Sequence, residues 1–436
     1  MGAQLKLDTE LGDKMHGLAS RLFPICRSLT GAGVRQTLGI LQEYLPDLRL
    51  YEVPSGTAAF DWTVPPEWNI RDAYVIAPDG KKIIDFKNSN LHVVGYSEPV
   101  NKTVTLAELQ EHLHSLPMQP EAIPYITSYY QRRWGFCLSH RLRETLKDGN
   151  YQVMIDSTIE PGALTYADFI VPGRSEKEVL ISTYICHPSL ANNELSGPVV
   201  TTFLARWVSE IPNRRLTYRF VFVPETIGSI VYISRNIDVL KARVVAGFNV
   251  SCVGDDRCYS YLPSRSGCSW SDRIAQHVLG RVAPSYKRYT FLDRGSDERQ
   301  YCAPGIDLPI ASVMRSKYGA YPEYHTSLDD LSLITPDGLL GGFTALRRCI
   351  EVLELDQRFD ACVLCEPQMG KRGLYSTLGT AAVSEAVQTR MDILAYSDGQ
   401  HSLLDIAEML GRPAWELAPY VTELTEHGLI RSVDPY

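Results

Sequence analysis

The middle of the chain alternates short apolar runs with segments of helical periodicity, and this alternation restricts the possible folds more than any other feature of the sequence. The apolar runs are residues 179–185, 216–223, 244–250 and 308–312. The helical segments among them are residues 198–211, 227–240 and 272–282. Strands that alternate with helices of this length indicate βαβ units, and an uninterrupted apolar run indicates a strand buried on both faces. We therefore predict an α/β fold with a mostly parallel central sheet flanked by helices.

With 436 residues, the chain is long enough for two or three domains, and its texture changes near the N-terminus. Residues 11–45 carry apolar side chains at helical spacing, interrupted by a glycine-containing turn. From residue 51 onward, short apolar pieces alternate with turn residues, as in a small β-rich module. We predict that residues 1–50 and 120–357 form the α/β domain and that residues 51–119 form a β-rich insert.

The last part of the chain, residues 366–436, is predicted to form a winged-helix-like domain. Its pattern is two helices joined by a Ser-Asp-Gly turn, a third helix after a Gly-Arg-Pro turn, and a short final strand. In the last 50 or so residues, acidic side chains outnumber arginine roughly three to one and lysine is absent. Because a DNA-binding domain needs clustered basic side chains, we expect a packing or homo-oligomer module that does not bind nucleic acid.

The composition excludes several classes of protein. A formal net charge of −8 argues against a nucleic-acid-binding protein. No stretch reaches the roughly 18–20 apolar residues that a membrane span needs, and the N-terminal residues lack the pattern of a secretory signal. The ten cysteines are scattered rather than regularly paired, which favours reduced thiols and a cytoplasmic location. Cys362 and Cys365 form a lone CxxC, where we expect no structural zinc.

Three polar clusters follow three of the predicted strands. His187 comes directly after the first apolar run, Glu225 directly after the second, and His325 after the last. The carboxyl ends of parallel strands share one edge of a sheet, and ligands bind there. Histidine and carboxylate side chains fixed in this way can bind a metal or transfer protons. Taken singly, His187 is equally compatible with a structural role, and Glu225 with capping of the following helix.

Together, the clusters resemble the M28 family of zinc aminopeptidases. That family has a strand followed by His, a segment GA-x-D-x-x-SG, a Glu pair, an Asp and the tripeptide YHT. The similar segments here are Ala191-Asn192-Asn193-Glu194-Leu195-Ser196-Gly197, Glu225-Thr226-Ile227-Gly228, Gly295-Ser296-Asp297-Glu298, Gly305-Ile306-Asp307-Leu308-Pro309, Tyr324-His325-Thr326 and the opening Arg27-Ser28-Leu29-Thr30-Gly31. The layout more closely resembles uncharacterised bacterial aminopeptidase-like proteins that carry a β-rich insert and a C-terminal winged helix, some of them linked to polysaccharide biosynthesis.

Several positions depart from the M28 pattern. Ser189 stands where the family has the Asp that orients the first histidine, and Asn193 stands where it has the Asp that bridges two metals. Thr226 replaces the second Glu of the pair, and Ser251 replaces the later Asp. Two cations held close together need carboxylates to offset their charge. The resemblance with these changes therefore implies one zinc ion rather than two.

The ligands that the resemblance implies are His187 and His325, with an oxygen from Asn193, Glu194 or Asp255. Glu225 is then the general base that takes the proton of the attacking water. Further residues of the matching segments are expected to bind the substrate, although ordinary packing is an equal alternative for the arginines and for most of the tyrosines. They are Asp297, Arg299, Tyr301, Arg315, Tyr318 and Tyr324. An arginine suits a substrate carboxylate, whereas an aminopeptidase also needs an acidic group, such as Glu194 or Asp297, for the substrate's α-ammonium group.

Three functions are compatible with these residues. The first is zinc-dependent hydrolysis of an amide or peptide bond in a small peptide-like substrate, as in aminopeptidases. The second is a non-catalytic descendant of the aminopeptidase fold that binds a metal or a ligand, which would explain the substitutions at Asn193, Thr226 and Ser251. The third is an amidase or deacylase that acts on a biosynthetic intermediate.

Overall fold

The computed structural model describes residues 2–374 and 381–433 of the chain, and its centre is one large sheet. The strands of this sheet are β1 (Arg49–Pro54), β10 (Ala163–Val171), β11 (Glu178–Tyr184), β12 (Thr217–Val223), β13 (Val244–Asn249), β14 (Ser260–Leu262), β15 (Lys287–Arg288) and β16 (Ile310–Met314). They lie in the order β1-β10-β12-β11-β13-β16-β14-β15. The adjacent strands β12, β11, β13 and β16 are parallel, and the antiparallel pairs lie toward the two edges. The predicted α/β fold with a mostly parallel central sheet is confirmed.

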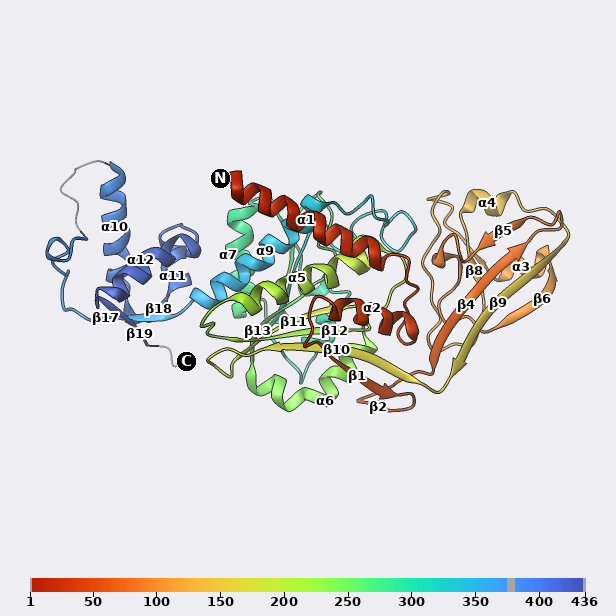
Figure 1. Cartoon of the computed structure of the whole chain (residues 1–436), viewed down its shortest axis with the longest axis horizontal. Coiled ribbons are helices and arrows are strands. Elements are labelled where there is room, and N and C mark those ends of the chain that lie inside the picture. Colours follow the sequence, from red (N-terminus) through yellow and green to blue (C-terminus); the bar gives the residue numbers. More distant parts are fainter. Residues whose placement is uncertain (1, 375–380, 434–436) are drawn as a thin grey trace.

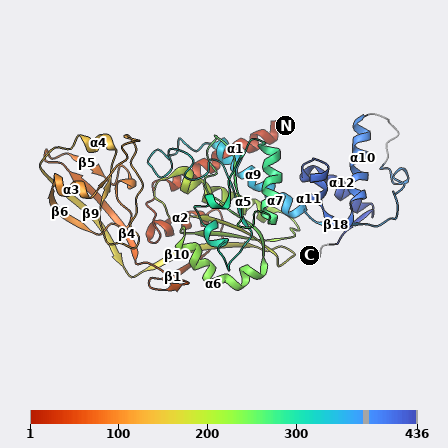
Figure 2. The ribbon, with the colours of Figure 1, turned by 180° about the vertical axis from the view of Figure 1, so that it is seen from behind.

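Helices cover both faces of the central sheet. They are α1 (Gly2–Leu22), α2 (Ala32–Gln42), α5 (Ser196–Glu210), α6 (Ile227–Arg243), α7 (Trp270–Val282), α8 (Glu298–Tyr301) and α9 (Pro336–Leu355). α1, α5 and α9 lie over one face and α6 over the other (Figure 1, Figure 2). Successive side chains of a strand point to opposite faces. In β11, Val179 and Ile181 accordingly join the core formed with α5 and α9, whereas Leu180 joins the core formed with α6.

A second, antiparallel sheet forms the insert. Its strands are β4 (Glu67–Ile76), β5 (Lys82–Asp85), β6 (Val100–Thr105) and β9 (Asn150–Glu160), in the order β5-β4-β9-β6. Smaller elements of this region are β2 (Ala58–Ala59), β3 (Trp62–Thr63), η1 (Asn90–His92), α3 (Leu106–Glu111), β7 (Leu113–His114), β8 (Phe136–Cys137) and α4 (His140–Glu144). Alternate residues of the long strands β4 and β9, such as Val75 and Val153, are buried in a core that belongs to the insert alone.

The insert does not coincide with the predicted residues 51–119. β1 pairs with β10, so the chain up to Pro54 belongs to the central sheet. β9 pairs with β4 and β6 of the insert, although residues 150–160 fall within the limits predicted for the α/β domain. A period of two along a strand shows which face is buried, but it does not show which strand lies alongside. The partner of β9 was therefore not readable from its sequence.

A three-stranded sheet and three helices form the C-terminal domain. The elements are β17 (Arg358–Ala361), α10 (Ala381–Ala395), β18 (Asp398–Ser402), α11 (Leu403–Met409), α12 (Ala414–Glu426) and β19 (Ile430–Ser432), with the strand order β18-β17-β19. The helix, turn, helix and strand pattern was predicted, but β17 places the start of the domain before residue 366. Residues 375–380 and 434–436 of the predicted domain lie outside the described residues.

The C-terminal domain packs against α7 and α9 of the α/β domain. Asp356 accepts hydrogen bonds from Trp270 Nε1 at 2.7 Å and from the Leu404 N–H at 2.9 Å. His277 Nε2 accepts the Ala414 N–H at 3.0 Å. Apolar residues of α11 and α12 join the same hydrophobic core as those of α9. The N-terminus of α12, the second helix of the helix-turn-helix pair, is therefore enclosed against the α/β domain.

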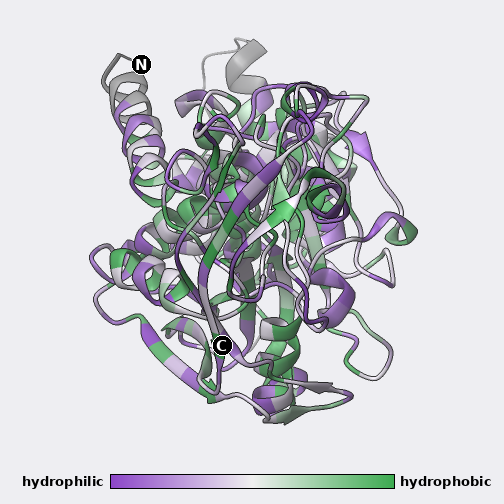
Figure 3. Ribbon diagram, turned by 90° about the vertical axis from the view of Figure 1, so that its right-hand side faces the viewer, coloured by the Kyte–Doolittle hydropathy of each residue, from purple (hydrophilic) through white to green (hydrophobic). Residues whose placement is uncertain are grey.

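The three parts lie in a row, with the α/β domain between the insert and the C-terminal domain (Figure 1). Seen along this row, hydrophobic residues concentrate toward the middle of the molecule and hydrophilic residues are frequent on peripheral loops (Figure 3). Among the described residues, no helix combines the length and apolar character needed to cross a membrane.

Candidate functional site

The candidate site lies beyond the carboxyl ends of the parallel strands. The loops after β11, β12 and β16 contribute His187, Glu225 and His325 respectively. His187 Nε2 is 3.7 Å from Glu225 Oε2, and the ring centroids of His187 and His325 are 5.4 Å apart. The structure thus brings together three side chains that are separated by up to 138 positions along the chain.

A buried carboxylate and a buried guanidinium hold His187 from behind. Glu194 Oε2 lies 3.0 Å from His187 Nδ1. Arg27 Nε donates to the His187 carbonyl at 2.9 Å and lies 3.3 Å from Glu194 Oε1. A metal-binding imidazole commonly donates its second N–H to a carboxylate. Glu194, predicted as a possible ligand, therefore occupies the orienting role that Ser189 cannot fill, and His187 Nε2 is left facing Glu225.

Glu194 belongs to a π-helical turn, Ala191–Leu195, directly before α5. Such turns are rare and are frequent at functional sites. The carboxylate of Asp329 holds this turn, because it accepts the N–H groups of Asn192 at 2.6 Å and Asn193 at 3.0 Å. Asp329 lies three residues after the tripeptide Tyr324-His325-Thr326, and the Tyr321 hydroxyl also donates to it at 2.9 Å.

Burial decides the protonation of the two imidazoles. It lowers the pKa of His187 to about 3, with a further contribution from the Arg27 charge. It also lowers the pKa of His325 to about 3, assisted by His187. Both rings are therefore neutral at pH 7, which is the state that binds a metal. Burial raises the pKa of Glu194 to about 8, and Arg27 opposes this rise.

His325 is held in an unusual backbone conformation with one nitrogen unpaired. Its φ is 57°, in the left-handed region that few non-glycine residues adopt. The Tyr324 ring stacks on the imidazole with centroids 3.9 Å apart. Among the described residues, no group hydrogen-bonds the buried His325 Nε2. A buried polar atom without a partner is costly, so this nitrogen is available for a ligand.

Glu225 reaches solvent, with 21% of its side chain exposed, and His325 is also only partly buried. The next residue, Thr226, has φ 65°, and its N–H donates to Asp297 Oδ1 at 2.7 Å. A β-branched residue in this region is strained, and such strain clusters at functional sites. Burial, together with the nearby Asp297 carboxylate, raises the pKa of Glu225 to about 8.

The donor set fits one metal ion better than two. Two imidazole ligands of a tetrahedral zinc ion have their nitrogens about 3.4 Å apart for zinc–nitrogen bonds near 2.1 Å, and the His187 and His325 rings are close neighbours, with centroids 5.4 Å apart. Asn193 Nδ2 is buried without a partner, while Asn193 Oδ1 lies 3.3 Å from the Tyr184 hydroxyl. Reversing this amide would put its oxygen at the unpartnered position. Thr226 and Ser251 supply no charge for a second ion.

Cys186, His187 and Glu194 are the one group of three ligand-type residues whose donor atoms lie mutually close in the part of the chain that the structure describes. Each is buried and already engaged: Cys186 Sγ accepts the Glu225 N–H at 3.1 Å, and Glu194 faces Arg27. A catalytic zinc ion needs an open coordination position. We therefore interpret this group as the support of His187 and not as a metal site.

Four residues predicted for the site have other roles in the fold. The Asp255 carboxylate accepts hydrogen bonds from Asn192, from the Arg257 N–H and from Ser316, so it is fully occupied as a structural group. The other three are tied to buried partners: Arg315 to the Asp255 carbonyl, Tyr301 to Ser182, and Tyr318 to Glu298. The positions of Arg315, Tyr301 and Tyr318 in the sequence could not reveal these partners, because each partner lies at least 20 positions away along the chain.

The remaining predicted residues do lie at the site. Asp297 is buried behind Glu225, and burial raises its pKa to about 6. Arg299 Nη2 donates to Thr226 Oγ1 at 3.0 Å, and its charge acts on Glu225. Tyr324 covers His325. Asp297 thus positions the Glu225 segment, whereas Arg299 and Tyr324 flank its carboxylate.

The insert region contributes a cover that the sequence did not reveal. The Tyr125 ring centroid lies 5.0 Å from that of His187 and 5.1 Å from that of His325. The Tyr125 N–H donates to the His325 carbonyl at 2.8 Å, and its hydroxyl lies 2.9 Å from that of Tyr129. The concentration of tyrosines at residues 125–130 was the available signal. It gave no indication of contact with residues sixty or more positions away.

The fold and the arrangement of His187, Glu225 and His325 define an aminopeptidase-like α/β protein with two appended domains. Residues 16–356 match the family described as a domain of unknown function, DUF4910, and the chain belongs to this family. Residues 358–432 match a winged helix-turn-helix family, which confirms the predicted C-terminal winged helix.

Relatives agree with this assignment. The chain is 45% identical over 405 residues, 92% of each chain, to a Clostridium acetobutylicum protein named as a candidate polysaccharide biosynthesis protein with an aminopeptidase-like domain. A crystal structure of a candidate peptidase from the same organism superposes with a TM-score of 0.93 and 42% identity over 99% of both chains.

More distant structures share the fold alone. The zinc aminopeptidase BSAP from Bacillus subtilis gives a TM-score of 0.56 at 11% identity, over 78% of this chain and 94% of that one. A peptidase M28 precursor from Shewanella amazonensis gives 0.54 at 12% identity, over 83% of this chain and 99% of that one.

Proposed function

We propose that the chain is a single-zinc hydrolase that cleaves an amide bond in a small substrate. The observation that carries this proposal is the pair of neutral imidazoles, His187 and His325, beside the partly exposed carboxylate of Glu225. The zinc aminopeptidase fold of the distant structures supports the same reaction class. His187, His325 and the Asn193 amide would hold the ion. A zinc ion bound there would polarise the scissile carbonyl and lower the pKa of a water molecule.

The protein's own groups perform the proton transfers. Glu225 takes a proton from the attacking water and delivers it to the leaving nitrogen. Its pKa near 8 belongs to the metal-free site, and a nearby cation would lower that pKa and favour the carboxylate. Glu194 holds the His187 ring in place through Nδ1. The Tyr125 and Tyr129 hydroxyls close one side of the site and exclude bulk water.

We favour an N-acylated biosynthetic intermediate over a free peptide as the substrate. Asp297 and Glu194 were the candidates for holding an α-ammonium group, yet both are fully enclosed within the fold. An amidase or deacylase does not need that group. The name of the Clostridium relative, which refers to polysaccharide biosynthesis, supports an acylated amino sugar as the first class of substrate to test.

The metal is tested by elemental analysis of protein purified without chelator. We expect about one zinc per chain in the wild type, and loss of that zinc in both His187→Ala and His325→Ala. His112→Ala is the matched control, because His112 is half-buried but stacks on Trp134 in the insert. No zinc in the wild type, even after zinc is added back, would refute the metal site.

The reaction is tested by a panel that sets aminoacyl anilides against N-acylated amino sugars. Glu225→Gln should retain zinc and lose hydrolysis, since the amide cannot accept the proton of water. Loss of zinc in this variant would instead assign Glu225 as a ligand. Full activity of the variant would show that another group is the base.

A ligand-binding protein without catalysis is the second candidate, and the position of Tyr125 over both imidazoles favours it. In this case the pocket would bind an amide without cleaving it. Any hydrolysis that a chelator abolishes and zinc restores would exclude this candidate.

The winged-helix domain is proposed to pack or to form homo-oligomers and not to bind nucleic acid. α12 carries Glu416, Glu423 and Glu426 but no lysine or arginine, and its N-terminus is enclosed against His277. A cytoplasmic location is proposed from the ten cysteines, all of which are free thiols.

A further inference from the structure

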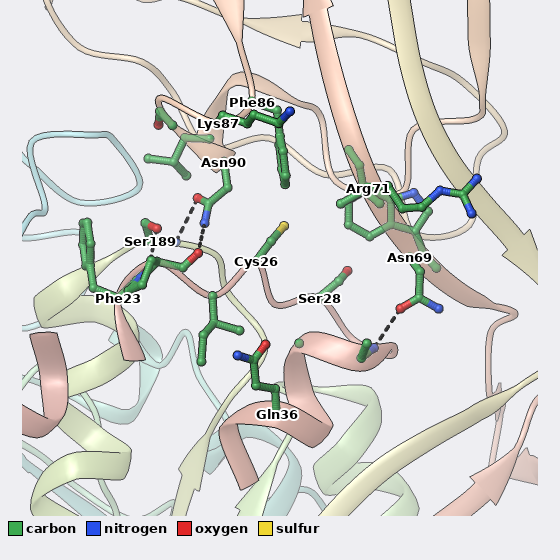
Figure 4. A pocket seen from close by; sticks show the side chains of 18 of the residues that line it. Phe23, Cys26, Ser28, Gln36, Asn69, Arg71, Phe86, Lys87, Asn90 and Ser189 are labelled. Atoms are coloured by element: carbon green, nitrogen blue, oxygen red, sulfur yellow. Dashed lines mark hydrogen bonds between the residues drawn. The ribbon is translucent and has the colours of Figure 1, made fainter. Parts of the chain in front are cut away.

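A cavity of about 730 Å³ lies between the α/β domain and the insert (Figure 4). One wall is the segment of residues 23–33 that leads into α2, and the other is β4 with the loop of residues 86–91. None of His187, Glu225 and His325 lines it. Small-molecule sites have volumes of about 300–1,000 Å³ and often lie between domains. The size and the place of this cavity are therefore those of a binding site.

The extended segment before α2 separates the cavity from the candidate zinc site. Side chains alternate along an extended chain. Arg27 points inward to His187 and Glu194, whereas Cys26, Ser28 and Thr30 line the cavity. Residues 27–31 therefore contribute to two sites. The proposed hydrolase uses Arg27, whereas Ser28 and Thr30 belong to the cavity.

Ser28 has a polar group that the fold leaves unused. Only 5% of the residue is exposed, and its side chain points into the cavity (Figure 4). Within the described residues, its hydroxyl makes no hydrogen bond. The hydroxyl faces the cavity and can both donate and accept a hydrogen bond, so it is available to a ligand there.

The N-terminus of α2, the positive end of its helix dipole, lies in the same wall of the cavity. Gly31 has φ 101°, and no side chain caps the helix through the usual N-cap bond. The Ala32 N–H donates to Asn69 Oδ1 at 2.8 Å, and both Ala32 and Gly33 line the cavity. The unpaired N–H groups of a helix N-terminus attract anions. An anionic group of a ligand is therefore favoured at this wall.

Further polar side chains line the cavity, and Asp330 is the acidic one among them. Gln36 and Asn88 are exposed amides whose side chains make no hydrogen bond with the rest of the described protein. Arg71 and Lys87 bring positive charge, and their partners Asp156 and Asp72 form only exposed or partly exposed ion pairs. Such surface pairs are weak, so both cations can also attract a ligand. The Phe86 ring provides an apolar surface.

We propose that this cavity binds a small saccharide that carries one anionic group, a phosphate or a carboxylate. The hydroxyl and amide groups of Ser28, Gln36 and Asn88 match the hydroxyl groups of a sugar, because each can donate and accept. The N-terminus of α2, with Lys87 and Arg71, receives the charge. This site is independent of zinc and of the proposed hydrolysis.

The test is isothermal titration of the full-length protein with four probes. Glucose 6-phosphate and glucuronate represent the two anionic classes, and glucose and inorganic phosphate are the controls. Ser28→Ala should weaken binding of the preferred probe about tenfold, the effect of one hydrogen bond to a polar or charged ligand. Because the Ser28 hydroxyl has no partner in the fold, the thermal stability of the Ser28→Ala variant should not fall. Ser312→Ala, which removes an unpaired buried hydroxyl in β16 outside the cavity lining, should leave binding unchanged.

Two further variants separate the cavity from the zinc site. Lys87→Gln should weaken an anionic probe several-fold and lower the salt dependence of binding. His187→Ala should bind the probe like the wild type. Three outcomes would each overturn the proposal. The first is that neither anionic probe binds, and the second is that inorganic phosphate binds as tightly as the anionic sugars. The third is that binding survives Ser28→Ala and is lost in His187→Ala. None of these outcomes bears on whether zinc is present.

Discussion

Arg27 offers a quantitative test of how the site is supported, through the variant Arg27→Met. Both the Arg27 and the Glu194 side chains are fully buried, and they form an ion pair at 3.3 Å. The variant removes the charge and also the hydrogen bonds to the carbonyls of His187 and Leu22, at 2.9 and 2.8 Å. Glu194 is mostly protonated at pH 7, so the loss there comes from the two hydrogen bonds that the charged guanidinium donates. At about 1.5–3 kcal/mol each, they suggest a loss of about 3–5 kcal/mol in the free energy of unfolding.

The pH dependence of this loss follows from Glu194. Its pKa is about 8 in the native wild type and about 4.3 in an unfolded chain. The native state therefore holds the extra proton, and stability falls as pH rises until Glu194 ionises near pH 8. Without Arg27 the native pKa is higher still. The difference between wild type and variant should be flat below about pH 8 and should grow by about 1.4 kcal/mol per pH unit above it.

Urea unfolding of metal-free protein between pH 6 and pH 10 measures this difference. The control is the same substitution in the Glu194→Gln background, where residue 194 cannot titrate and the loss should not vary with pH. A loss that is independent of pH in the wild-type background would refute the reasoning. The same slope in the Glu194→Gln background would assign it to another group.

Three further predictions concern other parts of the fold. Burial raises the pKa of Asp329 to about 6, so its contribution to stability is lost as pH rises from about 4 to 6. In Asp329→Asn, thermal stability should therefore vary less with pH in that window. The same pH dependence in the variant as in the wild type would contradict this. Tyr125→Phe should cost about 1 kcal/mol through the lost bond to Tyr129, with no added cost from Tyr129→Phe in a double-mutant cycle of urea unfolding. Asp356→Ala leaves the Trp270 N–H and an α11 N–H without their acceptor, and should speed proteolysis between the α/β and C-terminal domains; equal cleavage rates would show that the core contacts alone hold them.

The elements of the α/β domain were predictable because their patterns are local. The four apolar runs became β11, β12, β13 and β16 within two residues of the predicted limits. His187 and Glu225 follow two of these strands directly, so their place at one edge of the sheet follows from parallel pairing. His325 required the similarity of its tripeptide to a known family, because a long loop separates it from β16.

Other features depended on contacts between distant segments. Asp255 and Tyr318 have the right chemistry for a site, yet the Asp255 carboxylate bonds to the Ser316 N–H and the Tyr318 hydroxyl bonds to Glu298 in α8. Tyr125 belongs to a segment that pairs with the YHT loop through an isolated bridge between Pro124 and Thr326. No periodicity of the sequence signals a pairing of this kind.

The sequence by itself determined the class of fold and the residue types available for chemistry, because burial patterns and side-chain chemistry are properties of short segments. The tertiary structure decided which of those residues act together. Glu194 turned toward the back of His187, Asp255 became a structural acceptor, and β9 joined the insert. The last two outcomes depend on backbone paths that bring residues more than fifty positions apart into contact. The free energies of such contacts arise only in the packed protein, so no single segment of sequence contains them.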